Sequence, residues 1–174
     1  MRTTKRVTLS AMLVALGTVF MVVGAVFDVM DLTACAIASL MMVFAYLELG
    51  SPYTWLIWLS TTLASAIFFP GSVVWVEYLL VFGIYPILKA YIERLPSPFW
   101  WPIKLAYINA IIWGLMLLLD LLFGTPLLDA DTPVMKIILY VLINIAFIAY
   151  DLFITVMVRV YYEKLRPRIK GLLK

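Results

Sequence analysis

The sequence predicts an all-α integral membrane protein that crosses the bilayer six times. Two features of the composition support this fold class: 66% of the 174 residues are hydrophobic, and only 13% are charged. The mean hydropathy of +1.08 is a third observation that supports this fold class. Soluble domains carry about 25% charged residues. The chain therefore lacks the polar residues that a water-exposed surface of this size would need.

Six apolar stretches follow one another, separated by turns rich in Gly, Pro, Ser and acidic residues. A spanning helix needs roughly 20 apolar residues. The sixth stretch is longer than a bilayer requires, which predicts that it tilts or extends into the cytosol. We predict one membrane domain over 1–174, with spans at about 8–27, 32–47, 53–69, 73–92, 101–123 and 133–162.

Two further features concern single spans. The first span is too long for the hydrophobic region of a signal peptide, and no cleavage site follows it, so we expect it to be retained. Pro86 lies within the fourth span and predicts a kink there.

The placement of Lys and Arg indicates the orientation, because these residues concentrate on the cytoplasmic side. With the N-terminus inside, 12 of the 13 basic residues lie in inner segments, and only Lys136 lies outside. We therefore predict a plasma-membrane protein with both termini in the cytoplasm. The outer turns are acidic and favour a neutral or cationic ligand; they carry Asp28, Asp31, Asp129 and Asp131.

The sequence lacks the residues that several kinds of chemistry require. There is no histidine, and Cys35 is the one cysteine, so we expect no zinc, haem or iron–sulfur site. Ser-His-Asp and Cys-His catalysis lack their base, and no phosphate-binding P-loop motif occurs. We expect no enzyme activity, cofactor, metal or nucleic-acid partner. The basic flanks indicate orientation and contacts with anionic membrane lipids.

Polar residues within the spans are the candidates for function, because ionisable groups in a membrane are costly and usually face the bundle interior or a cavity. On the sixth span, the spacing of Lys136, Tyr140, Asn144, Phe147 and Asp151 places them on one stripe. We predict an aromatic-walled pocket that opens outward between spans four, five and six. Its substrate-binding residues would be Trp75, Glu77, Tyr78, Trp113, Asp120, Lys136, Tyr140 and Asn144.

A structural interpretation of the same residues stays open. Asn109 and Asn144 can hydrogen-bond neighbouring helices, and Asp151 can pair with Lys104 at the inner end of span five. Lys136 can direct its ammonium outward to the interface, and Trp or Tyr side chains near span ends are commonly interfacial anchors.

Small residues four positions apart let helices approach closely. Ala11 and Ala15 form such a face at the cytoplasmic end of span one, directly after a basic leader. Ala34 and Ala38 form a second one on span two.

The chain resembles the S components, the substrate-binding subunits, of energy-coupling factor (ECF) transporters. The resemblance covers the length, the six spans, the opening segment 5–17 with its AxxxA, and the closing segment 144–165 with a basic tail. It implies capture of a vitamin or similar small molecule from outside. It also implies docking of Ala11 and Ala15 on a transmembrane coupling subunit that works with two ATPase subunits. No vitamin-specific binding motif is found.

Three alternatives remain at this level. The first is a membrane scaffold, because proteins of the MreD family look like the same six-span fold but have no ligand site. Tyr150-Asp151 resembles the YD pair of intramembrane aspartyl proteases, with Asp120 as a second carboxylate, but the GxGD motif is missing. A stand-alone secondary transporter with Glu77 or Asp151 as proton carrier would usually show an internal repeat, and none is evident.

Overall fold

The computed structural model describes residues 3–27, 30–124 and 133–169, which are helical apart from short turns and contain no strand. In chain order the helical segments are α1 (Thr3–Val26), α2 (Asp31–Leu49), α3 (Ser51–Phe68), α4 (Val74–Glu77), the π-helix η2 (Tyr78–Phe82), α5 (Tyr85–Ile92), the 3₁₀ turn η3 (Ser97–Phe99), α6 (Trp100–Phe123), α7 (Pro133–Val160), the π-helix η4 (Tyr161–Leu165) and α8 (Arg166–Ile169).

The predicted all-helical architecture is confirmed, and the helices fit a multi-pass membrane protein by length and composition. Within the described residues, five segments are long and apolar enough to cross a membrane: Thr3–Val26, Asp31–Leu49, Val74–Ile92, Ser97–Leu118 and Val134–Lys164. The remaining predicted span corresponds to α3, whose 18 residues include several Ser and Thr, and it is not one of the five. The predicted ends agree with the helices to within a few residues, and α1 begins earlier than expected.

The turns follow from their glycines and prolines. Gly50 has a φ of 85°, a conformation that L side chains rarely adopt, and it joins α2 directly to α3. Pro52 lies in the first turn of α3, where its missing N–H costs nothing. α3 ends just before Pro70 and Gly71.

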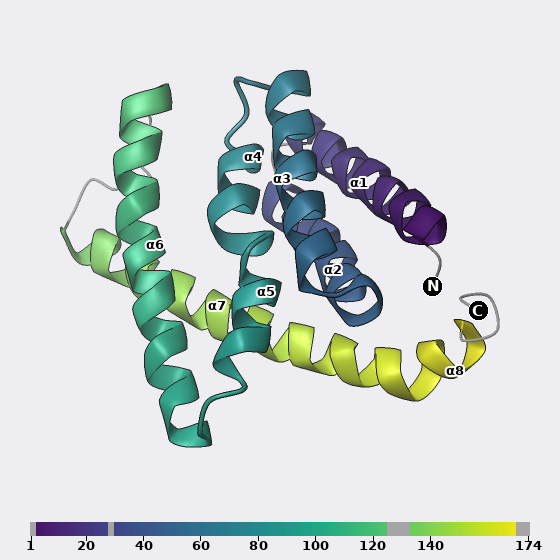
Figure 1. The fold of residues 1–174 in the computed structure, drawn as a ribbon. Helices are drawn as coiled ribbons and strands as arrows, with labels where there is room; N and C mark the ends of the chain where they lie inside the picture. The colour runs from purple at the N-terminus through teal and green to yellow at the C-terminus, as the bar shows by residue number, and fades with distance from the viewer. Residues whose placement is uncertain (1–2, 28–29, 125–132, 170–174) are drawn as a thin grey trace.

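Two hydrophobic clusters form the core. α1, α2 and α3 lie side by side (Figure 1) and surround the first cluster, which Val74 and Tyr78 complete from the fourth span. The second cluster lies between the fourth span and α6 and α7, and its members include Val76, Val81, Tyr85, Ile108, Ile112, Phe147 and Ile154. The fourth span therefore separates the two cores and contributes side chains to both.

α7 crosses the other helices steeply: in Figure 1 it crosses α6 near its middle and runs obliquely below α1, α2 and α3. It contacts α6 in its first half and α2 near its C-terminus, where the Tyr161 hydroxyl donates to Glu48 Oε1 at 2.5 Å. This oblique course agrees with the tilt that its length predicts.

Most of the apolar surface is uncovered. Between 17% and 44% of the residues in each span's most apolar window are buried within the chain. The exposed remainder is largely Leu, Ile, Val and Met. Apolar faces of this extent are stable against lipid hydrocarbon rather than water.

Candidate functional site

The fourth span is a broken helix. α4 passes into the π-helix η2, and the chain turns at 83–84 before α5 begins. Pro86 explains the break, because it has no N–H to donate to the Phe82 carbonyl and its ring clashes with that carbonyl. The Gly83 amide donates instead to the Tyr78 carbonyl at 2.7 Å, five residues back rather than four. The predicted kink is therefore confirmed.

Three carbonyls of the broken segment accept hydrogen bonds from aromatic side chains of other helices. The pairs are Trp58 Nε1 with Leu79 O at 3.3 Å, Tyr107 Oη with Leu80 O at 2.5 Å, and Tyr150 Oη with Phe82 O at 3.2 Å. These donors come from α3, α6 and α7. A carbonyl without a partner in a bilayer costs several kcal/mol, so the three side chains hold the break in place.

Removing these hydroxyls should destabilise the bundle. We expect Tyr107→Phe and Tyr150→Phe each to lower the free energy of unfolding by about 1–2 kcal/mol, because a buried carbonyl loses its donor. Unfolding by SDS in mixed micelles measures this, with the exposed Tyr162→Phe as control. Wild-type unfolding curves for both variants would show that these hydrogen bonds do not support the break.

Four charged side chains meet where α5, α6 and α7 come together. Lys104 Nζ lies 2.9 Å from Asp151 Oδ1 and 2.9 Å from Glu93 Oε1. Lys89 Nζ contacts the same two oxygens, that of Glu93 at 2.9 Å. The Tyr85 hydroxyl also donates to Asp151 Oδ1 at 2.5 Å. The predicted pairing of Asp151 with Lys104 is confirmed, and Lys89 adds a second ammonium group.

This ion cluster is electrically balanced, with two ammonium and two carboxylate groups. The side chains of Lys89, Lys104 and Asp151 are almost completely buried. Buried charges are tolerated only when paired and hydrogen-bonded. Because both Asp151 oxygens accept hydrogen bonds from Lys104, this carboxylate has a structural partner, and the structure gives an aspartyl-protease role no support.

The predicted binding residues fall into separate groups. Tyr140 and Asn144 of α7 meet Asn109 of α6: the Tyr140 hydroxyl donates to Asn109 Oδ1, and Asn109 Nδ2 donates to Asn144 Oδ1 at 3.3 Å. Asn109 Nδ2 also donates to the Leu105 carbonyl at 2.7 Å. This confirms the structural interpretation of the two asparagines as hydrogen-bonding partners between helices.

Glu77 and Tyr78 lie instead toward the first three helices. Tyr78 is buried in the first cluster, which also contains Cys35 of α2. Glu77 Oε2 is buried and has no hydrogen-bond partner among the described residues. The indole Nε1 of Trp75 donates to the Pro70 carbonyl at 3.4 Å.

The remaining predicted residues do not complete one pocket. Trp113 is 65% exposed, Lys136 is exposed, and the side chain of Asp120 is outside the described part of the chain. Among the described side chains, the predicted residues of spans four, five and six do not gather at one place, and a pocket there stays a prediction. Asn109 of α6 is hydrogen-bonded to α7, whereas Trp113, one turn further along α6, is left uncovered.

An open depression of about 590 Å³ lies at the end of the bundle where α1 ends and α2 begins. Asp31, Phe68, Phe69 and Ser72 are among its lining residues. Of the acidic residues predicted for the outer turns, Asp31 is the one in the described part of the chain. Glu77 follows Val73 of this rim by one helical turn and donates its amide to the Val73 carbonyl at 3.2 Å.

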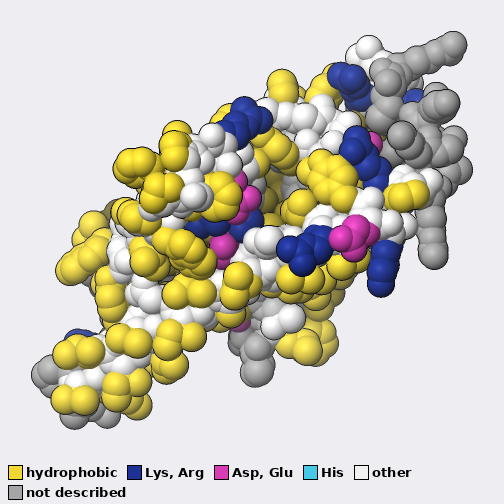
Figure 2. All heavy atoms as spheres, turned by 90° about the horizontal axis from the view of Figure 1, so that it is seen from below, with side chains coloured by type: hydrophobic (Ala, Val, Ile, Leu, Met, Phe, Trp, Pro, Cys, Tyr) yellow, Lys and Arg dark blue, Asp and Glu magenta, His cyan; other side chains and the backbone are white. Residues whose placement is uncertain are grey.

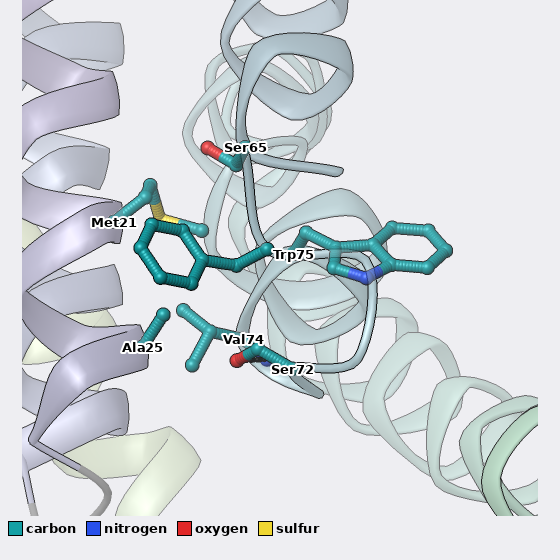
Figure 3. Close-up of a pocket in the computed structure, with 7 residues that line it drawn as sticks. Met21, Ala25, Ser65, Ser72, Val74 and Trp75 are labelled. Atoms are coloured by element: carbon teal, nitrogen blue, oxygen red, sulfur yellow. Dashed lines mark hydrogen bonds between the residues drawn. The ribbon is translucent and has the colours of Figure 1, made fainter. Parts of the chain in front are cut away.

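A smaller space lies beside this depression (Figure 3). Met21, Ala25 and Val74 point into it, whereas the Trp75 indole points away from α1. Its volume of about 10 Å³ is no larger than one water molecule needs. Of these two spaces, only the larger depression has room for a small organic molecule.

The predicted docking residues are available. Ala11 and Ala15 are both exposed on α1. Ala15 also borders an apolar groove of about 610 Å³ between α1 and α3, with Thr18, Val19 and Ala64. The small side chains on both sides leave space for the backbone of another helix to approach.

Sequence reasoning missed Lys89 and the three aromatic donors of the broken span. The orientation rule places Lys89 among the basic residues of the inner segments, and no spacing rule relates Trp58, Tyr107 or Tyr150 to carbonyls on another helix. The signal available was Pro86, since a proline in a span frees a carbonyl that must find a donor elsewhere.

Among the described residues, no group of three or more Cys, Asp or Glu side chains is placed to hold a metal ion. No protein-family model matches the chain, and neither the curated proteins nor the solved structures give a significant match.

Proposed function

We propose that this chain is the substrate-capturing subunit of an ECF-type importer, with six spans in the plasma membrane and both termini in the cytoplasm. The observation that supports capture most directly is Glu77, a membrane-embedded carboxylate with a buried, unpartnered oxygen one turn below the depression. Structural carboxylates in a membrane are normally paired, as Asp151 is. An unpaired one is typical of a ligand site.

The site then lies between the α1–α2 and α3–α4 turns rather than between the last three spans. Asp31 supplies negative charge, Phe68 and Phe69 supply aromatic walls, and Glu77 adds a buried carboxyl oxygen without a hydrogen-bond partner. This combination favours a small neutral or cationic molecule that donates hydrogen bonds.

The exposed Ala11 and Ala15 supply the docking face for the coupling subunit, which two ATPase subunits would energise. The chain itself has no nucleotide-binding loop. Capture and energy supply would therefore reside in different subunits.

Replacing Glu77 should reduce ligand binding. In native mass spectra of protein purified from its own host, we expect Glu77→Gln to retain at least about tenfold less ligand than the wild type, because a charge-assisted hydrogen bond contributes about 1.5–3 kcal/mol. Glu163→Gln, an exposed acidic position in η4, serves as the control for net charge. Equal ligand occupancy in the two variants would remove Glu77 from the site.

Enlarging the alanine face should prevent docking. We expect Ala11→Trp or Ala15→Trp to abolish co-purification of the coupling subunit, because an indole blocks close helix approach. Leu56→Trp on the exposed face of α3 is the matched control and should keep the complex. Intact complexes with both alanine variants would show that docking uses another surface.

A membrane scaffold of the MreD-like type is the second candidate. It is favoured by the described polar side chains of α6 and α7, Asn109, Tyr140 and Asn144, which hydrogen-bond to each other. A scaffold would carry no small-molecule mass in the same spectra.

A further inference from the structure

One member of the ion cluster is far less constrained than the others. The side chain of Glu93 is 33% exposed, compared with 3–5% for Lys89, Lys104 and Asp151. Glu93 directly follows the last residue of α5, whereas Asp151 lies in the middle of α7. One oxygen of Glu93, Oε1, receives both ammonium groups. Its side chain can therefore swing out without disturbing a helix.

The charges that would remain are unbalanced. Without Glu93, the buried ammonium groups of Lys89 and Lys104 would face a single carboxylate, that of Asp151. This carboxylate contacts both lysines and accepts a hydrogen bond from the Tyr85 hydroxyl. An uncompensated buried charge is costly. The position that Glu93 Oε1 occupies between the ammonium groups of Lys89 and Lys104 is therefore suited to an anionic oxygen.

The location of this site indicates which anion it meets. It lies at the end of the bundle where α6 begins with Trp100 and Trp101, and Lys104 Nζ is 5.6 Å from the centre of the Trp101 ring. Tryptophans at helix ends mark the membrane–water boundary. Figure 2 shows this lower face, where basic and acidic side chains lie next to one another among hydrophobic ones. Basic pockets between helices at this depth are suited to lipid phosphate groups.

We propose that Lys89 and Lys104 form a binding site for the phosphate group of an anionic phospholipid, and that Glu93 occupies this site when no lipid is bound. Arrival of the lipid moves the Glu93 carboxylate outward, and a phosphate oxygen takes its place between the two ammonium groups. This site lies at the opposite end of the bundle from the depression and does not depend on the proposed transport function.

Binding of phosphatidylglycerol by the detergent-purified full-length chain, followed by native mass spectrometry, tests this proposal. We expect Glu93→Gln to bind phosphatidylglycerol at least about tenfold more tightly than the wild type, because the internal competitor is gone. Glu163→Gln changes net charge equally but lies outside the cluster, and it should bind like the wild type. Phosphatidylcholine should show no such gain.

Two results would overturn the proposal. Equal affinity for phosphatidylglycerol in Glu93→Gln and Glu163→Gln would mean that Glu93 does not occupy a lipid site. If inorganic phosphate raises the unfolding midpoint of Glu93→Gln as strongly as phosphatidylglycerol does, the site takes a soluble phosphate and not a lipid. Loss of the gain in Lys89→Gln/Glu93→Gln would support the assignment, and its persistence would contradict the role of Lys89.

Discussion

The Asp151→Asn variant is expected to lose about 3–5 kcal/mol of its free energy of unfolding, because breaking a buried ion pair leaves an uncompensated charge. The change keeps the shape of the side chain but leaves Lys89 and Lys104 with Glu93 as their one carboxylate. It also weakens the acceptor for the Tyr85 hydroxyl. The contacts between α5, α6 and α7 should therefore open first.

SDS titration in mixed micelles measures this loss, and a double variant supplies the control. Lys104→Gln in the Asp151→Asn background restores electrical balance, so part of the lost stability should return. A single Asp151→Asn variant within about 1 kcal/mol of the wild type would mean that the cluster is more hydrated than its burial indicates.

The Gly83→Ala variant is expected to lose about 3 kcal/mol, at the upper end of what overpacking costs. A Cβ atom there would lie 2.6 Å from Trp58 Cδ1 and 2.8 Å from the Tyr78 carbonyl oxygen. The indole is fixed by its hydrogen bond to the Leu79 carbonyl, and the Tyr78 carbonyl belongs to the π-helix. Neither neighbour can move cheaply, so the break itself must distort.

Gly114→Ala is the matched control, because a Cβ at Gly114 meets no atom within 4 Å and the residue lies inside α6. There the same substitution should stabilise the helix by roughly 0.5–1 kcal/mol. Thermal unfolding of the two variants compares them directly. Equal behaviour of Gly83→Ala and Gly114→Ala would show that the tight packing at the break is not required.

Much of the fold could be predicted because membrane crossing imposes a length and a polarity on every segment. The ends of α2, α6 and α7 follow from apolar runs and from their flanking glycines, prolines and charges. The pairing of Asp151 with Lys104 could be predicted for the same reason, since a charge within a span needs a partner.

The candidate site could not be predicted to the same degree. Which residues share a pocket depends on how the helices cross, and the steep crossing of α7 leaves no trace in the spacing of its own residues. A further local cause explains why Glu77 and Tyr78 lie in a different part of the bundle from Asn144. Alternate faces of the fourth span contact different cores, so neighbouring residues there lie in different environments.

The proposed arrangement separates three tasks along the bundle. The depression near Asp31 and Glu77 would receive a ligand at one end. The ion cluster around Asp151 fixes α5, α6 and α7 at the other end. The broken fourth span connects the two, since α4 carries Glu77 and α5 carries Lys89. In this proposal, the ligand site and the ion cluster therefore occupy opposite ends of one small chain.

Native mass spectrometry of the protein, purified gently from its own host, tests the proposed function most directly. The account predicts a bound small molecule, lost in the Glu77→Gln variant, together with co-purifying coupling and ATPase subunits. A protein that carries no ligand, or that associates with cell-envelope machinery alone, would contradict substrate capture and favour the membrane scaffold.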